Sequence, residues 1–377
     1  MPKNLFSLRF LRNYLSTLAF LLLGWYVCFH LSGFHQGILK AVASVRFASF
    51  STTLRAPELF VNLLGLYALI LIPYYVTQPW INSKTWVFLR GLWLGIRRAK
   101  SSTPSLKRKK GRSRVRPRTP KSWLSPVTRQ AALALLLKFF FAPLMINWCL
   151  AHIGDMLHNF ELVRNDLLVG IEGRALFDHA LFWAAFQLIL FVDTLLFTLG
   201  YIIEMPRLKN RILTVETSFL GWFVCLACYP PFNTYTGDLF RWQSSDFPHF
   251  ENDGIHFFMN CAILLLMGIY SWASVALGFK ASNLTNRGIV HSGPYAWVRH
   301  PAYAAKNLAW WIGALPTFYI AFGGGLRAGL YAVFCTAGWS FIYVMRAITE
   351  ERHLLRTNNG YVEYAKTVRW RFIPGLI

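Results

Sequence analysis

Long apolar segments recur along this chain and decide what it can fold into. A helix of about 20 apolar residues crosses the roughly 30 Å hydrocarbon core of a bilayer, and several segments reach that length. In lipid, each such segment satisfies its own backbone hydrogen bonds as a helix. We therefore predict an all-α protein, a polytopic helical bundle integral to a membrane. The eight expected spans cover residues 15–32, 57–80, 131–151, 180–203, 212–232, 255–279, 303–322 and 326–347.

Charge separates the loops between these spans into two groups. The chain has 39 Lys and Arg but only 16 Asp and Glu, a net charge of +23. In a soluble chain this excess would suggest a nucleic-acid partner. Here most basic residues fall in alternate loops, and such residues gather on the cytoplasmic side of membrane proteins. We therefore predict that both termini are cytoplasmic, in a bacterial inner membrane or the endoplasmic reticulum. Loop 33–56 is the exception, since it carries basic residues on the opposite side.

The most basic loop, residues 97–129, contains no acidic residue at all. Its section 107–118 is rich in Lys, Arg, Ser and Pro, a composition typical of disordered segments. One interpretation is that the loop only fixes the topology. The other is that it contacts anionic lipid headgroups, which is worth about 1 kcal/mol per basic residue. Nucleic acid is the least favoured partner, and we expect none.

A polar and aromatic turn interrupts the apolar pattern between the sixth and seventh spans. It reads His291-Ser-Gly-Pro-Tyr-Ala-Trp-Val-Arg-His-Pro-Ala-Tyr303. Its glycine and two prolines predict a shaped turn instead of a continuous helix. One interpretation is an interfacial loop whose aromatic residues and Arg anchor two helices. The other is one half of a binding site.

A second polar cluster follows the last span and supplies a partner for this turn. Arg346 and Glu350 share one helix face, because four residues separate them. A surface ion pair would also explain them. Such a pair is more stable when the acid precedes the base, however, and here Arg346 comes before Glu350. A hairpin through Phe322-Gly-Gly-Gly325 would bring the turn and this cluster together in one polar pocket.

The two clusters together resemble the isoprenylcysteine carboxyl methyltransferase family and the related phospholipid N-methyltransferases. The resemblance covers about residues 255–377. We accordingly predict an N-terminal membrane region, 1–211, with four spans and a basic cytoplasmic loop at about 81–130, followed by a methyltransferase-like membrane core, 212–377. The motifs that carry the resemblance are Ser292-Gly-Pro-Tyr-Ala-Trp-Val-Arg-His-Pro-Ala-Tyr303, Glu350-Glu351-x-x-Leu354, Tyr361-x-x-Tyr364 and Arg371-x-Ile-Pro374.

The resemblance implies S-adenosylmethionine as methyl donor and implies no metal. A carboxylate such as Glu350 suits the cationic amino group of the donor. Tyr295, His300 or backbone N–H groups would bind its carboxylate. Arg346 would face the methyl acceptor and position it. The residues expected to bind the cofactor are Arg287, Gly288, Ile289, Val290, Tyr295, His300, Pro301, Ala302, Tyr303, Glu350 and Glu351, with Lys280 as a looser match.

We predict methyl transfer to a lipophilic, anionic acceptor at the cytoplasmic membrane face. The acceptor would be a carboxylate, phosphate or phenolic lipid, or an isoprenylcysteine. Such a transfer requires alignment of the reacting groups and exclusion of water. One alternative is an NADPH-dependent membrane reductase of the sterol-reductase type, which would carry Asn-Pro in place of His300-Pro301. The other is a non-catalytic transport or lipid-binding protein, in which the glutamates or the His-Pro turn would be lost.

Three polar features inside the expected spans allow more than one interpretation. Asp193 lies in the fourth span, where an ionisable residue is a candidate functional group unless a polar side chain on a neighbouring helix satisfies it. Lys306, just inside the seventh span, is expected to reach back to the membrane surface. Cys225 and Cys228 have C-x-x-C spacing, but we expect them to behave as small apolar residues because no second pair accompanies them.

Overall fold

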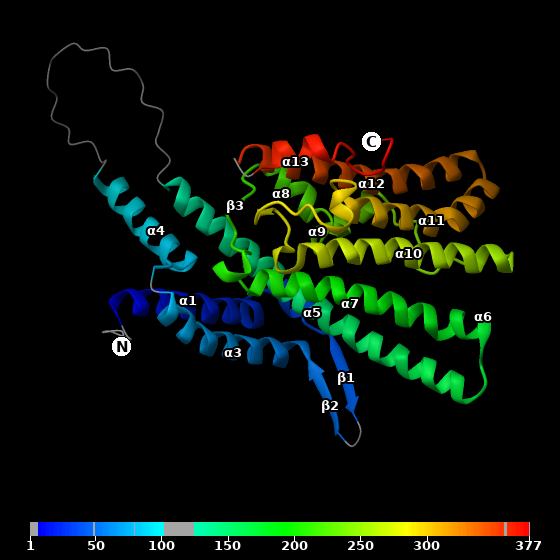
Figure 1. The fold of residues 1–377 in the computed structure, drawn as a ribbon, viewed down its shortest axis with the longest axis horizontal. Helices are drawn as coiled ribbons and strands as arrows, with labels where there is room; N and C mark the ends of the chain where they lie inside the picture. Colours follow the sequence, from blue (N-terminus) through cyan, green and yellow to red (C-terminus); the bar gives the residue numbers. More distant parts are fainter. Residues whose placement is uncertain (1–6, 48–49, 79, 102–123, 358–359, 377) are drawn as a thin grey trace, which may run out of the picture. The chain divides into compact units, whose positions relative to one another are not determined.

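The computed structural model describes residues 7–47, 50–78, 80–101, 124–357 and 360–376, and helices dominate it (Figure 1). Within these residues the strands form only two short antiparallel pairs, so the all-α prediction is confirmed. The chain divides into two compact units, residues 1–36 with 59–140 and residues 37–58 with 141–377. The division predicted from the sequence, with a boundary at residue 211, is a different one and stays a prediction.

Six helical segments of the described chain are long and apolar enough to cross a membrane, as expected for a multi-pass membrane protein. The predicted count of eight is not confirmed. The longest helix within the predicted span 212–232 is α8 (Phe219–Leu226), whose eight residues rise about 12 Å and cannot cross a bilayer. The span predicted at 303–322 is α11 (Pro301–Gly323), which is long enough but less apolar than the six. Those six are Leu8–Leu31, Ala56–Thr77, Pro126–Leu168, Gly173–Ile202, Asp253–Lys280 and Leu326–Leu355.

The first unit joins its helices through buried hydroxyl groups. The Ser16 hydroxyl on α1 lies 3.2 Å from the Ser83 hydroxyl and 3.0 Å from the Thr85 hydroxyl at the start of α4. Small polar side chains of this kind often hold membrane helices together. The strongly basic section 107–118 lies outside the described residues. The helices of this unit are α1 (Leu8–Tyr26), the π-helical turn Val27–Leu31, α3 (Ala56–Thr77), α4 (Lys84–Ser101) and the first part of α5 (Pro126–Leu168), with α2 (Gly33–Ile38) at its boundary.

The second unit contains the remaining elements. One antiparallel pair joins β1 (Val42–Phe47) to β2 (Phe50–Arg55), and the other joins β3 (Thr214–Val215) to β4 (Thr285–Asn286). The helices are the second part of α5, α6 (Gly173–Leu176), α7 (Phe182–Ile202), α8, α9 (Phe232–Leu239), α10 (Asp253–Leu277), α11, α12 (Leu326–Leu355) and α13 (Tyr361–Thr367), with a π-helical turn at Phe177–Leu181 and 3₁₀ turns at Pro206–Leu208, Gly278–Lys280 and Gly293–Ala296.

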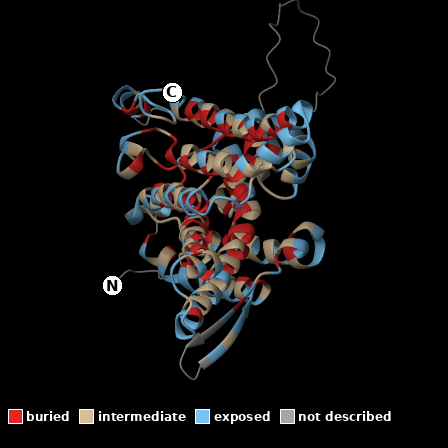
Figure 2. Cartoon of the chain, turned by 90° about the vertical axis from the view of Figure 1, so that its right-hand side faces the viewer, coloured by how far each residue is buried: buried red, intermediate tan, exposed pale blue. Residues whose placement is uncertain are grey.

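Helices α7, α10, α11 and α12 lie side by side and form the helical core of the second unit (Figure 1). Apolar side chains fill the contact of the first three: Phe182 and Phe186 on α7, Ile263 and Met267 on α10, and Ala309 on α11. Figure 2 shows buried residues on the facing sides of the helices and exposed residues on the outer sides. The hairpin predicted between α11 and α12 is confirmed, and Gly325 turns the chain there with a φ of 131°.

The segment between α10 and α11 is held from several directions, and its predicted character as a shaped turn is confirmed. Gly293 has a φ of 61°, and a Cβ atom there would lie 3.3 Å from the indole nitrogen of Trp272. On its other side, the backbone N–H of Arg299 donates to the Trp370 carbonyl at 2.9 Å, and that of His300 donates to the Arg371 carbonyl at 2.8 Å. The C-terminal segment therefore pairs with the turn and fixes the start of α11.

Candidate functional site

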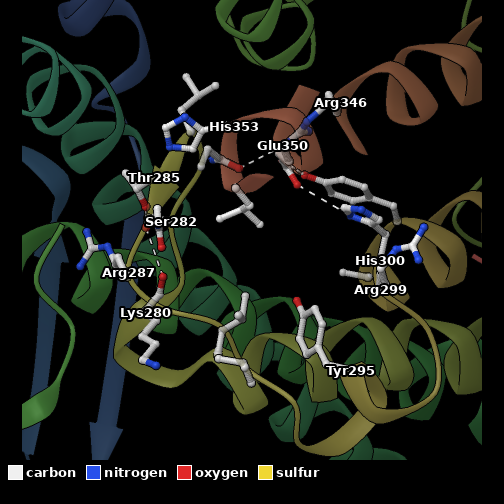
Figure 3. A pocket seen from close by; sticks show the side chains of 18 of the residues that line it. Lys280, Ser282, Thr285, Arg287, Tyr295, Arg299, His300, Arg346, Glu350 and His353 are labelled. Carbon is white, nitrogen blue, oxygen red and sulfur yellow. Dashed lines mark hydrogen bonds and ion pairs between the residues drawn. The ribbon is translucent and has the colours of Figure 1, made fainter. Parts of the chain in front are cut away.

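A cavity of about 220 Å³ lies where the segment 281–303 meets the C-terminal half of α12 (Figure 3). The turn and the downstream cluster, which the sequence predicted to meet, both contribute to its wall. Two of the residues predicted to bind a cofactor, Pro301 and Glu351, are not among those lining it. The predicted residues that line the cavity are Arg287, Gly288, Ile289, Val290, Tyr295, His300, Ala302, Tyr303, Arg346 and Glu350.

Glu350 faces the cavity. Its carboxylate accepts a hydrogen bond from the Tyr303 hydroxyl and lies 3.8 Å from Nδ1 of His300. The His300 ring stacks on the Tyr303 ring with 5.5 Å between their centroids. Tyr295 points its hydroxyl into the cavity from the wall opposite Glu350 (Figure 3). The site thus presents an acidic group on one side and a hydroxyl donor on the other.

Glu351 points in another direction, because one residue along a helix turns the side chain by about 100°. Its side chain is buried, and its carboxylate accepts a hydrogen bond from Arg299 Nε at 2.8 Å. His300 Nε2 lies 3.2 Å away, and Arg371 contacts the other oxygen at 3.0 Å. Glu351 therefore connects α12 to the turn and to the C-terminal segment. It also contacts Nε2 of His300, the ring nitrogen other than the one nearest Glu350.

Arg346 is a buried cation at the cavity wall. Its Nη2 donates to the side-chain oxygen of Asn283 at 3.0 Å, while its Nε has no hydrogen-bond partner among the described residues. The guanidinium lies 5.0 Å from the ring centroids of both Tyr303 and Tyr343 and 5.8 Å from that of Tyr229. Aromatic faces attract cations, so these rings hold the charge without neutralising it. Within the described chain, Arg346 forms no salt bridge with Glu350 or with any other carboxylate.

Asn283 positions Arg346, and no motif in the sequence predicts this role. Its side-chain nitrogen lies 3.0 Å from the hydroxyls of both Tyr201 and Tyr229. These tyrosines come from α7 and from the segment after α8, outside the C-terminal third. A satisfied polar network of this kind fixes the geometry of a buried group. Arg346 is therefore oriented by parts of the chain that are far apart in sequence.

The segment 286–290 lines the cavity mainly through its backbone. The Arg287 guanidinium turns away from the cavity and donates to the Asn210 carbonyl at 2.7 Å (Figure 3). Burial lowers the pKa of this guanidinium, which the nearby Glu204 carboxylate opposes. Gly288 has a φ of 89°, and a Cβ atom there would lie 3.6 Å from Nζ of Lys280. The loosely matched Lys280 also lines the cavity.

An aromatic wall closes the side of the cavity nearest the C-terminal segment. Tyr361 and Tyr364 pack in one cluster with Ile289 and Leu354, and all four line the cavity. The Tyr364 hydroxyl donates to the Tyr295 carbonyl at 2.8 Å. Burial raises the pKa of Tyr364 to about 12, so this hydroxyl stays protonated and remains a donor at neutral pH.

Glu216 and His353 form a further polar pair that sequence reasoning missed. Nδ1 of His353 lies 3.6 Å from the Glu216 carboxylate, and its Nε2 lies 3.1 Å from the Thr214 hydroxyl. Both residues of the pair line the cavity. Glu216 precedes α8 in a stretch that the sequence predicts to be a membrane span. Its position in the cavity wall was therefore not predictable from the sequence. Among the residues that the structure describes, no group of three or more His, Cys, Asp or Glu is placed to hold a metal ion.

The segment from α10 to the end of α12 supplies much of this cavity wall. Residues 255–356 match the model of the isoprenylcysteine carboxyl methyltransferase (ICMT) family. The chain carries an ICMT family domain in its C-terminal third. Enzymes of this family use S-adenosylmethionine. No curated protein and no solved structure matches the chain. The ICMT domain does not include several residues that complete the cavity wall, among them Glu216, Tyr229, Tyr361 and Tyr364.

Proposed function

We propose that this cavity binds S-adenosylmethionine and that Arg346 positions a lipophilic, anionic methyl acceptor beside it. One observation carries the proposal: Arg346 and Glu350 line the same cavity, yet they form no ion pair with each other. The simple surface ion pair that the sequence allowed is therefore absent, and Arg346 is only 3% exposed. A buried cation without an acidic partner is costly, so its retention suggests an anionic ligand.

The residues present fit the methyl donor. Glu350 would pair with its amino group in a charge-assisted hydrogen bond. The Tyr295 hydroxyl and His300 would hold its carboxylate. The cluster of Tyr361 and Tyr364 offers apolar aromatic surface for a base ring. When bound, the donor would supply an electrophilic methyl group to the acceptor oxygen and would leave as S-adenosylhomocysteine.

The contribution of the chain to this reaction is alignment and exclusion of water. Arg346 would attract the anionic oxygen of the acceptor and keep it at the cavity wall, where Asn283 fixes the direction of the guanidinium. An ionised acceptor has no proton to lose, so no general base is required. A carboxylate, a phosphate, a phenolate or the carboxylate of an isoprenylcysteine each satisfies this chemistry. We place the site at the cytoplasmic face, because the basic loops predict that orientation.

Binding of S-adenosylhomocysteine to the purified protein tests the cofactor site. In isothermal titration we expect the wild type to bind, and Glu350→Gln and His300→Ala to weaken binding at least tenfold. Glu363→Gln is the matched control, because this glutamate is exposed on α13 and does not line the cavity. No binding by the wild type, or wild-type affinity in Glu350→Gln and His300→Ala, would contradict the proposal.

Arg346→Ala separates the acceptor role from the cofactor role. We expect this variant to bind S-adenosylhomocysteine as the wild type does and to lose most methyl transfer. Turnover is measured with lipid extracts and a methyl-labelled donor, and mass spectrometry identifies the product. An equal loss of binding and turnover would assign Arg346 to the cofactor site instead.

A further inference from the structure

A second cavity, of about 90 Å³, adjoins the first. The two share several wall residues, so they are neighbouring chambers of one site. The shared residues are Phe197, Tyr229, Tyr270, Lys306 and Tyr343, and the smaller cavity is completed by Met145, Trp148, Asp193, Thr194 and Cys228.

Lys306 does not reach back to the membrane surface, so the expectation from the sequence is wrong. Its side chain lines both cavities, and its ammonium lies 5.1 Å from the Tyr270 ring and 5.5 Å from the Trp310 ring. In the described part of the chain, this ammonium has no hydrogen bond and no salt bridge. The aromatic rings on α10 and α11 hold the cation in place while its donors remain directed toward the cavity.

Asp193 lines the smaller cavity together with Lys306, but the two form no salt bridge in the described chain, and both oxygens of the carboxylate accept hydrogen bonds from other groups. One accepts a hydrogen bond from the Tyr270 hydroxyl at 2.5 Å, and the other accepts one from the Ser274 hydroxyl. Polar side chains on the neighbouring helix α10 therefore satisfy this aspartate, which was one of its two interpretations from the sequence. Its charge lowers the cost of burying Lys306 without contacting the ammonium. The donors of Lys306 thus remain available to a ligand.

Tyr343 stands between this cation and Arg346. Its ring lies 5.0 Å from the Arg346 guanidinium and 5.1 Å from the ring of Trp310, over which Lys306 lies. Two cations without a salt-bridge partner in the described chain therefore face the joined cavities, one at each end of a row of aromatic rings. This arrangement suits a ligand whose negative charge enters the smaller cavity.

We propose that the smaller cavity binds the anionic, oxygen-bearing head group of the methyl acceptor, and that Lys306 holds its charge there while Arg346 contacts the reacting oxygen from the larger cavity. The inference rests on the proposed function and extends it to a named subsite. One water-sized group needs roughly 10–15 Å³ of such a volume, so the cavity has room for a head group but not for a lipid chain. The hydrocarbon part of the acceptor therefore stays outside it, among the apolar helices.

Seven of the ten residues that line this subsite lie outside the ICMT domain, among them Cys228 and Tyr229 from the segment after α8. Met145 and Trp148 belong to α5, and Asp193, Thr194 and Phe197 belong to α7. The ICMT domain contributes Tyr270, Lys306 and Tyr343. Segments outside the ICMT match thus supply most of the subsite wall, and in this proposal they determine which head group fits.

Equilibrium binding of radiolabelled amphiphiles tests the subsite. Protein in neutral phosphatidylcholine nanodiscs, saturated with S-adenosylhomocysteine, is titrated with dodecanoate, dodecyl phosphate and dodecan-1-ol. We expect at least one anion to bind tenfold tighter than the alcohol, and which one identifies the head group. Lys306→Met is expected to remove this preference and Lys306→Arg to retain most of it. The control is Lys366→Met, since Lys366 is exposed on α13 and lines neither cavity.

Two results would overturn the inference: equal binding of both anions and the alcohol by the wild type, or an unchanged preference in Lys306→Met. Affinity for S-adenosylhomocysteine shows whether each variant is folded, and its absence in the wild type would refute the cofactor proposal separately. If Lys306→Met does not fold, Thr194→Leu fills the same cavity from α7 without changing charge. Thr194→Leu should weaken anion binding at least tenfold, and wild-type anion binding in this variant would also refute the subsite.

Discussion

At the scale of single residues, the two neighbouring glutamates of α12 differ because the helix turns them in different directions. Glu350 faces the cavity, while Glu351 is surrounded by Arg299, His300 and Arg371. Sequence adjacency made both of them candidates for the same role. Only the direction of each side chain separates the carboxylate that we propose binds a ligand from the one that holds the site together.

Glu351→Gln should therefore destabilise the protein. The change keeps the size of the side chain but leaves Arg299 and Arg371 without their acidic partner. Removing one partner of a buried ion pair typically costs roughly 3–5 kcal/mol. Thermal unfolding in detergent should show a clearly lower midpoint than in the wild type. Glu350→Gln is the matched control and should unfold near the wild-type temperature, and equal midpoints in the two variants would contradict these assignments.

Residue types and spacing predicted much of the cavity wall, but not the partners of its charges. Arg346, Glu350 and His300 were found because their motif is local. Asn283 and Glu216 were missed because their role depends on segments that meet only in the folded chain. Lys306 was misjudged for a related reason, since its distance from the span end does not reveal the aromatic rings that hold it in the interior.

At the scale of elements, the turn before α11 is fixed by the segment after α13. Backbone hydrogen bonds join Arg299 and His300 to residues 370 and 371, and Arg371 reaches Glu351 with two nitrogens. The turn was predictable from its glycine and prolines, and the α11–α12 hairpin from its glycines. The short length of α8 was not predictable from the sequence, because its apolar composition resembles that of a membrane span. Glu216, Ser218 and Pro230 restrict its length.

Arg371→Met should loosen this connection. The variant loses both contacts to Glu351, so the backbone amides of Arg299 and His300 should exchange with deuterium several-fold faster. Arg369→Met is the control, because only the carbonyl of this residue contributes, accepting a hydrogen bond from Arg299 at 2.9 Å. Mass spectrometry of peptides that cover the turn measures the rate of hydrogen–deuterium exchange and tests this prediction. Similar exchange in both variants would mean that the backbone pairing alone holds the turn.

At the scale of the whole molecule, α10 determines how the second unit sits in a bilayer. Its 25 residues rise about 37 Å, enough to cross the hydrocarbon core. The residues just before it and those after it must then lie at opposite membrane faces. The basic loops predict that the later end, which leads into the cavity, is the cytoplasmic one.

Single cysteines introduced at the two ends check this orientation. Ser292→Cys and Glu251→Cys use exposed positions on either side of α10. In sealed vesicles of inverted orientation, a membrane-impermeant maleimide should label Ser292→Cys and leave Glu251→Cys unlabelled. The wild type is the control for the chain's own cysteines, of which 28, 225 and 335 are buried. The reverse labelling pattern would overturn the proposed topology.

The pairing of β3 with β4 has a consequence for any attempt to work with part of this chain. Thr214 and Val215 lie outside the ICMT match, yet they pair with Thr285 and Asn286 inside it. A fragment trimmed to the matched residues 255–356 would lose one side of that ladder and the Asn210 carbonyl to which Arg287 donates. Chimaeras that exchange acceptor preference between relatives should therefore place their junctions before α5, and a cut at residue 255 should yield a collapsed cavity.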